Sequence, residues 1–380
     1  MTKPQAVLRR KDTTSRSALY IAFDLGDKNW QVSLGDDRFQ VSRYTVAAGD
    51  TAAVAARILK AAERLRISGR SEVYGVYEAG RDGWWFHRWL RELGVDNIVV
   101  DAASIEVNRR ARRAKTDRLD ADKLLALLIR HHAGERVWSV LREPSVEDED
   151  ARREHRELQR LTHERIAHTN RIGSLLVMHN LRPGIVIGGR DWSKWWDAHQ
   201  EQVPPLLRSE IERENARLKL VKDQVRAIES AHRKELAERK HPMVNELARL
   251  RAIGDKGSWV LVKEIFGWRN FSNRRELTGC VGLAPTPHAS GSIDHEQGIS
   301  KTGNRRARSV LIEQAWSWVR LQPGSELTQW FNRRFGGSGK RMRRVGIVAL
   351  ARRLAIALWR YLKDGVIPAG AVLKPDTGRA

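Results

Sequence analysis

The first 145 residues alternate between short apolar runs and longer amphipathic stretches. Three runs rich in β-branched and aromatic residues are separated by Gly and Asp turn signals, which favours a β-meander. A stretch with helical spacing follows, and strands then alternate with helices. The expected order is three strands, a helix, a strand, a helix and a strand, at 20–26, 30–36, 39–46, 50–66, 72–80, 83–93 and 97–103. This order predicts a mixed α/β sheet.

Between residues 146 and 240 the pattern changes to dense alternating charges with few β-branched residues, which predicts long helices. An apolar heptad repeat in the second of them suits a coiled coil. It consists of Ile211, Leu218, Val221, Val225 and Ile228. The first helix has a looser seam around 158–175. An antiparallel hairpin and a dimer contact through the same seam both satisfy this pattern.

The segment 241–367 is expected to be mainly helical. It opens with a Gly-containing turn between two short helices at 250–267, a common way to present backbone amides to a phosphate. The apolar run at 345–362 is broken by three arginines, which indicates an amphipathic helix rather than a membrane span. The expected fold class is therefore α/β plus α. The expected segments are a disordered basic N-terminus at 1–17, a mixed-sheet domain at 18–145, a helical coiled-coil region at 146–240, a C-terminal domain at 241–367 and a tail at 368–380.

The net charge of the chain indicates what kind of partner it binds. The chain has 380 residues and a mass of 43.4 kDa, with 69 Lys and Arg against 46 Asp and Glu, a formal charge of +23 and a pI near 10.7. Such an excess favours a nucleic-acid partner over a merely soluble basic protein or one that binds an anionic membrane surface. The cations are densest between 301 and 363, where they face only Glu313 and Glu326. Binding to a phosphate backbone requires such segregation of charge.

Cysteine content and the N-terminus bear on location. Cys280 is the only cysteine, so the chain can form neither an internal disulfide nor a cysteine-based zinc site. The first 17 residues are basic and polar without an apolar core, unlike a signal peptide or a membrane anchor. We expect a cytoplasmic protein of a prokaryotic cell, associated with the nucleoid when it acts.

Four carboxylates stand out as candidate chemistry. Asp24 lies inside one apolar run and Glu78 ends another, each beside a Gly-bearing turn, so their side chains can meet if the two strands are neighbours. Asp117 and Asp120 are three residues apart at the start of a helix and share one face. Asp in a first helical turn is also favoured by the helix dipole without any chemistry. As a set, however, the four suit the two metal ions of phosphodiester chemistry, and all-oxygen ligands select Mg²⁺ or Mn²⁺.

Several blocks of the sequence resemble a known family. The blocks YIAFDLGDKNW, VYEAG and RRAKTDRLDADKLL are similar to the acidic blocks of the RuvC-like DEDD insertion-sequence transposases, a group that includes bridge-RNA-guided recombinases. The stretch GCVGLAPTPHASGSIDHEQGISKTGNRRAR resembles that family's second domain. The resemblance covers most of the chain, apart from its first residues and about the last dozen.

The resemblance implies an RNase H-like, or RuvC-like, fold in which Asp24, Glu78, Asp117 and Asp120 bind the metal ions. It also implies that Ser290 is a nucleophile that forms a covalent phosphoserine link with DNA. Family members are understood to form dimers that pair into tetramers, so that the carboxylates of one subunit act with the serine of another. Some members use a noncoding RNA from their own element as a guide, which makes such an RNA an expected partner here.

Alternatives remain at the level of sequence. Ser292 lies two residues from Ser290, and a Ser beside Gly is also ordinary turn chemistry. The nearby candidates to activate the serine are His288, His295 or a metal ion, and the pattern favours surface positions or phosphate contacts for the two histidines over a role as bases. Phosphate contacts are expected from Lys301, Arg305, Arg306 and Arg308.

Two other classes of protein fit part of the pattern. A nuclease or junction resolvase would use the carboxylates with water as nucleophile, and a non-catalytic nucleic-acid-binding protein would need only the charge. Asp27 and Asp122 are further acidic neighbours of the expected metal site.

Overall fold

The computed structural model describes residues 18–36, 41–65, 72–106, 117–290 and 293–375, with the side chains of 117–119 and 286–297 also left outside the description. The chain divides into two compact units, Met1–Pro144 and Ser145–Ala380.

The first unit is built on a mixed five-stranded sheet. A meander of β1 (Leu19–Leu25), β2 (Asn29–Gly35) and β3 (Ser42–Ala47) is antiparallel, whereas β4 (Val73–Glu78) and β5 (Asp96–Val100) extend it in parallel from β1. The strand order is β3-β2-β1-β4-β5. The mixed α/β sheet predicted from the hydrophobic pattern is therefore confirmed.

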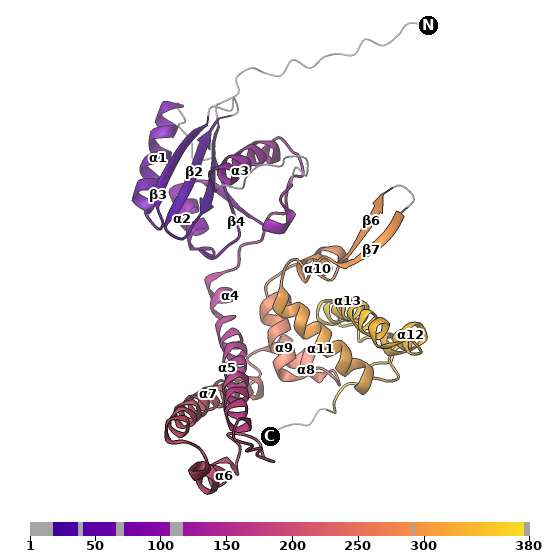
Figure 1. Cartoon of the computed structure of the whole chain (residues 1–380). Coiled ribbons are helices and arrows are strands. Elements are labelled where there is room, and N and C mark those ends of the chain that lie inside the picture. The colour runs from indigo at the N-terminus through magenta and orange to yellow at the C-terminus, as the bar shows by residue number, and fades with distance from the viewer. Residues whose placement is uncertain (1–17, 37–40, 66–71, 107–116, 291–292, 376–380) are drawn as a thin grey trace, which may run out of the picture. The chain divides into compact units, whose positions relative to one another are not determined.

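Helices cover both faces of this sheet (Figure 1). One face packs on α1 (Thr51–Arg64) and α2 (Trp85–Leu93), and the other on α3 (Asp117–His132). The alternation of β1 explains the layering, because Ile21 and Phe23 are buried beneath α1 and α2 while Ala22 is buried beneath α3. A short 3₁₀ turn, η2 (Ala102–Ser104), follows β5.

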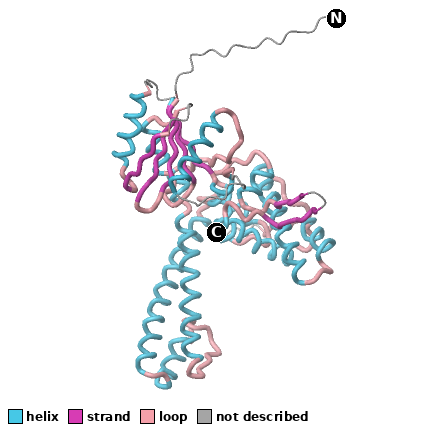
Figure 2. Tube along the Cα trace, turned by 45° about the horizontal axis from the view of Figure 1, so that its top comes forward, coloured by secondary structure: helices cyan, strands magenta, loops and turns pink. Residues whose placement is uncertain are grey.

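The second unit begins with a long helical hairpin, seen lengthwise in Figure 2. A short α4 (Val146–Asp150) precedes α5 (Arg153–Val177), which packs along α7 (Pro205–Ala237); α6 (Trp192–His199) and η3 (Gln200–Gln202) lie in their connection. The heptad positions of α7 are buried or partly buried against α5 in antiparallel order, since Ile211 and Leu218 cluster with Ile172 while Val225 clusters with Leu158. Within this chain, the seam is thus occupied by the hairpin itself.

The remainder of the second unit folds around a single helical core. Its Gly-containing turn joins α8 (Pro242–Arg249) to α9 (Asp255–Leu261), which continues into a π-helical turn, η4 (Val262–Phe266). After α10 (Arg274–Cys280) come two strands, β6 (Pro285–Ser290) and β7 (Ile293–Ile299). The unit ends with α11 (Arg305–Leu321), α12 (Glu326–Phe335) and α13 (Lys340–Asp364).

The β6–β7 hairpin is a feature that the hydrophobic pattern missed. Its strands contain proline, glycine and polar residues, which are typical of turns rather than strands. Pairing is irregular between Pro285 and Pro287, as expected where proline lacks an N–H. In the part of the chain that the structure describes, no helix is both long and apolar enough to cross a membrane.

Candidate active site

Asp24 and Glu78 lie at the same edge of the sheet, at the carboxyl ends of the parallel neighbours β1 and β4. The paired register runs as far as Phe23 opposite Tyr77, so the two carboxylates occupy the next position on each strand. Because Ala22 and Val76, two residues earlier, both pack beneath α3, strand alternation places Asp24 and Glu78 on the α3 face. The sequence analysis required the strands of Asp24 and Glu78 to be neighbours for the two side chains to meet, and β1 and β4 are neighbours.

Helix α3 runs antiparallel to these strands. Its last residue, His132, packs its ring against Tyr74 near the start of β4, with centroids 3.9 Å apart. Further toward the N-terminus of α3, Asp122 accepts a 2.7 Å hydrogen bond from the hydroxyl of Ser33, a β2 residue paired with Ala22. Asp120 lies two residues earlier, about 3 Å along the helix axis, and so approaches the strand ends that carry Asp24 and Glu78.

Asp120 is half-buried, as is Asp24, whereas Glu78 is exposed at the sheet edge. Asp117 is the first residue of α3, but its side chain lies outside the described residues. Among the side chains that are described, no group of three or more His, Cys, Asp or Glu is placed to hold a metal ion. The four-carboxylate metal set therefore stays a prediction, with Asp24 and Glu78 at one edge of the sheet.

The other acidic neighbours are engaged elsewhere. The second oxygen of Asp122 accepts a 2.7 Å hydrogen bond from Nε of Arg43, so this carboxylate ties α3 to β2 and β3. Asp27, in the β1–β2 turn, pairs with Arg81 in the loop after β4. These contacts give both residues structural roles.

Ser290 is the last residue of β6 and pairs with Ile293 across the hairpin. The same register sets His288 directly opposite His295, so the two histidines of the sequence prediction are cross-strand partners. The side chains of all these residues lie outside the description, as does Ser292 altogether. The backbone thus places the serine next to the tip of a two-stranded hairpin rather than in an isolated turn.

Comparison with known proteins decides the family. A protein-family model described as "Transposase IS116/IS110/IS902 family" matches residues 244–329, from α8 into α12. The predicted transposase y4rJ of Sinorhizobium fredii is 38% identical over 382 residues, covering 94% of this chain and 95% of its own. The chain belongs to the IS116/IS110/IS902 transposase family. The transposase for insertion sequence element IS1328 of Yersinia enterocolitica is a more distant relative, 25% identical over 59% of this chain and 66% of its own. DNA cleavage and transfer in general follow from membership of this family.

The cations expected to bind phosphate differ in their surroundings in this transposase. Arg305 and Lys301 are exposed, and Arg306 donates from Nε to the side-chain oxygen of Gln159 at 3.0 Å. Arg308 is half-buried, and its Nη1 donates to the carbonyl oxygens of Val281 and Thr302, both at 3.0 Å. Burial, reinforced by the charge of Arg305, lowers the pKa of Arg308. Arg308 therefore holds the loop before α11 in place. This contact gives Arg308 a structural role that does not depend on phosphate.

A buried ionic cluster in the second unit escaped the sequence interpretation. The Glu264 carboxylate, with its side chain 1% exposed, accepts hydrogen bonds from Nε and Nη2 of Arg156 at 2.8 and 2.9 Å. His155 Nε2 and Asn304 Nδ2 complete its shell, each at 2.8 Å. Burial opposes ionisation, but the hydrogen bonds from His155 and Arg156 outweigh it and hold the pKa of Glu264 well below its usual range. A lone Glu in an apolar run was the only sequence signal.

This cluster joins three separate segments of the transposase. Glu264 belongs to the π-helical turn, His155 and Arg156 to the start of α5, and Asn304 caps α11 by accepting a hydrogen bond from the N–H of Ala307. The buried carboxylate of Glu264 therefore anchors the α5–α7 hairpin to the helical core from which β6 and β7 extend. Its role is to position the elements of the second unit.

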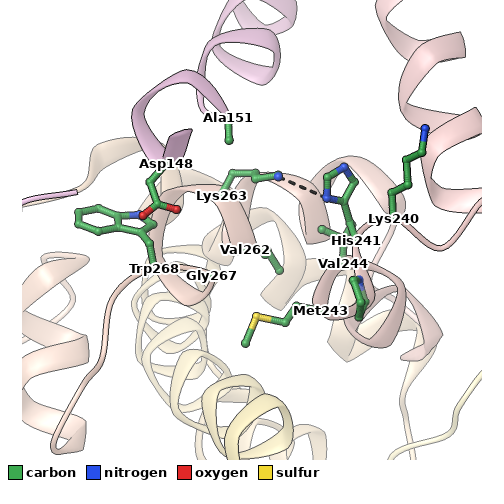
Figure 3. A pocket seen from close by; sticks show the side chains of 11 residues that line it. Asp148, Ala151, Lys240, His241, Met243, Val244, Val262, Lys263, Gly267 and Trp268 are labelled. Carbon is green, nitrogen blue, oxygen red and sulfur yellow. Dashed lines mark hydrogen bonds between the residues drawn. The ribbon is translucent and has the colours of Figure 1, made fainter. Parts of the chain in front are cut away.

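A pocket of about 270 Å³ lies beside the same π-helical turn (Figure 3). Lys263 points across it toward His241, whose Nδ1 is 3.4 Å from the lysine Nζ. The other ring nitrogen of His241 donates to Glu235 at 2.8 Å, which leaves Nδ1 to accept from the lysine. Burial lowers the pKa of Lys263. The pocket is smaller than the roughly 300–1,000 Å³ of small-molecule sites. Its polar side chains have partners within the protein, since Lys263 binds His241 while Lys240 pairs with Glu238 and Asp148 accepts from the N–H of Ser145.

Proposed function

We propose that this chain cuts and rejoins the DNA of an insertion sequence, using a carboxylate set that binds Mg²⁺ or Mn²⁺ together with a serine nucleophile. What supports the proposal is that Asp24 and Glu78 end two neighbouring strands on the face that α3 covers, and that Asp122 near the start of α3 binds Ser33 of β2. A sheet that begins with a meander and continues in parallel is consistent with an RNase H-like domain.

The residues present fit a divalent metal site. Their donors are all carboxylate oxygens, which hard cations such as Mg²⁺ and Mn²⁺ prefer. Asp117 and Asp120 are three residues apart at the start of α3. Asp24, Glu78, Asp117 and Asp120 would hold the ions, and bound ions would supply Lewis-acid stabilisation of charge on the scissile phosphate. Without cations, four clustered carboxylates would repel one another and the DNA.

In the proposed serine step, one bond to phosphorus forms as another breaks. Ser290 Oγ forms a bond to phosphorus while the bond from phosphorus to one ribose oxygen breaks, and the serine proton passes to a base as the leaving oxygen gains a proton. Attack by a ribose hydroxyl on the phosphoserine reverses these changes and rejoins the strand. The hairpin supports this role because it sets Ser290 at the end of β6, next to the connection to β7.

Trapping of the covalent intermediate tests the serine. Wild-type protein incubated with element-end DNA and Mg²⁺ is expected to give a protein–DNA adduct on denaturing gels, and Ser290→Ala is expected to abolish it. Ser292→Ala is the matched control and should retain the adduct. An adduct that survives Ser290→Ala but not Ser292→Ala would assign the nucleophile to Ser292; one lost in neither variant would place it elsewhere.

We further propose that the active assembly is a homodimer that pairs into a tetramer on DNA, guided by a noncoding RNA. Family resemblance and the net charge of +23 support a nucleic-acid guide in addition to DNA. Protein purified from cells that carry the whole element is expected to retain a short structured RNA encoded beside its gene. Sequencing of the bound RNA checks this expectation, and recovery of only unrelated cellular RNA would contradict it.

A further inference from the structure

We propose that the corner between α12 and α13 docks this transposase on duplex DNA, with the start of α13 entering the major groove. The docking corner comprises residues 333–345: the end of α12, the four-residue turn 336–339 and the first residues of α13. The inference rests on the proposed function for its choice of DNA as partner. It is tested by binding alone, so a failure to cleave DNA would leave the test intact.

Uncompensated positive charge is the first argument. The docking corner carries six cations, all exposed: Arg333, Arg334, Lys340, Arg341, Arg343 and Arg344. None of them forms an ion pair with the acidic residues that the structure describes. The acidic residues of the two helices are Glu326, at the start of α12, and Asp364, at the end of α13, so both lie away from the corner. A field of one sign in a compact patch attracts a polyanion.

Shape is the second argument. Residues 340–345 are all exposed, whereas Gly346 is buried where α13 meets α12. A Cβ at Gly346 would lie 2.5 Å from the ring of Phe335, so the two helices touch there and α13 extends beyond the contact. Six residues of helix span about 9 Å, close to the roughly 8.5 Å depth of the major groove, which is wide enough to admit a helix.

Exposed apolar side chains on the same turns are the third argument. Met342 and Val345 are 47% and 50% exposed, and both lie among the cations. Apolar side chains contact the methyl group of thymine in the major groove, so such residues add sequence preference to phosphate binding. The major groove of A-form RNA is too narrow for side chains to read, which favours duplex DNA as the occupant. The family model ends at residue 329, before the corner begins.

The test is the salt dependence of DNA binding by the full chain. Replacing Arg341, Arg343 and Arg344 together with alanine is expected to reduce the slope of log K against log salt by about 2 to 3 on a duplex of about three helical turns. The control removes three arginines that each pair with an acid three residues earlier: Arg160, Arg226 and Arg249. Both variants lose the same charge, but the control should keep most of the slope.

Three outcomes would overturn the proposal. Equal slopes for the docking and control variants would mean that net charge alone matters. An unchanged slope in the docking variant would place the DNA elsewhere. If the docking variant lost affinity only for double-stranded RNA of the same sequence, the docking corner would bind the guide RNA and not DNA. Thermal unfolding midpoints equal to wild type are expected for the docking variant, because residues 340–345 are outside the core; Met342→Ala should change sequence preference without changing the slope.

Discussion

Replacing Asp24 with alanine is expected to lower the rate of DNA strand cleavage by about 1,000-fold or more, because loss of a metal-binding carboxylate removes about 4 kcal/mol of transition-state stabilisation. Asp24 lies at the end of β1 on the α3 face, beside Glu78 at the end of β4. Asp120→Ala is expected to act in the same way. Single-turnover cleavage of element-end DNA, measured with and without Mg²⁺, checks both.

Asp27→Ala is the matched control for these variants. Asp27 is three residues from Asp24, but its carboxylate is 76% exposed and paired with Arg81, so its loss should leave cleavage within a few-fold of wild type. DNA affinity should be retained in all three variants, since the basic surface that binds phosphate is unchanged. Cleavage at wild-type rates by both Asp24→Ala and Asp120→Ala would contradict the metal-site proposal.

Replacing Glu264 with glutamine is expected to lower the free energy of unfolding of the second unit by about 3 kcal/mol, the lower end of the cost of breaking a buried ion pair. Glutamine leaves Arg156 without its counter-ion, and the lower end applies because that arginine is 40% exposed and can be hydrated. Urea unfolding followed by tryptophan fluorescence measures the difference. Glu157→Gln, at an exposed pair with Arg160, should cost less than about 1 kcal/mol.

The stabilising effect of Glu264 should also depend on pH. Its pKa in the folded protein is below the ordinary value of 4.5, because hydrogen bonds from His155 and Arg156 overcome the opposing effect of burial. The stabilisation is therefore complete above about pH 4.5 and is lost as the pH falls toward the folded pKa. The difference between wild type and Glu264→Gln should shrink in acid, and a difference that grew there would contradict this assignment.

Strand periodicity allowed the carboxylate edge to be anticipated. An apolar run that ends in Asp24 and another that ends in Glu78 predict two strand ends, and the parallel pairing of β1 with β4 brings them together. The antiparallel course of α3 was not predictable, because it depends on the packing of His132 and Asp122 against the sheet. The sequence analysis set Asp122 apart from the four expected metal ligands, but only the folded chain shows that its carboxylate binds Ser33 and Arg43.

Local patterns alone determined the elements of the first unit, the two long helices of the hairpin and the basic character of the C-terminal helices, because periodicity and charge are properties of the chain itself. Only the tertiary structure decided which elements contact one another. In the folded chain, α5 packs on the apolar seam of α7, and two polar segments pair as β6 and β7. Glu264 is buried with partners in α5 that are more than 100 residues away along the chain. Contacts between residues distant in sequence arise only when the chain is folded, so no local pattern contains them.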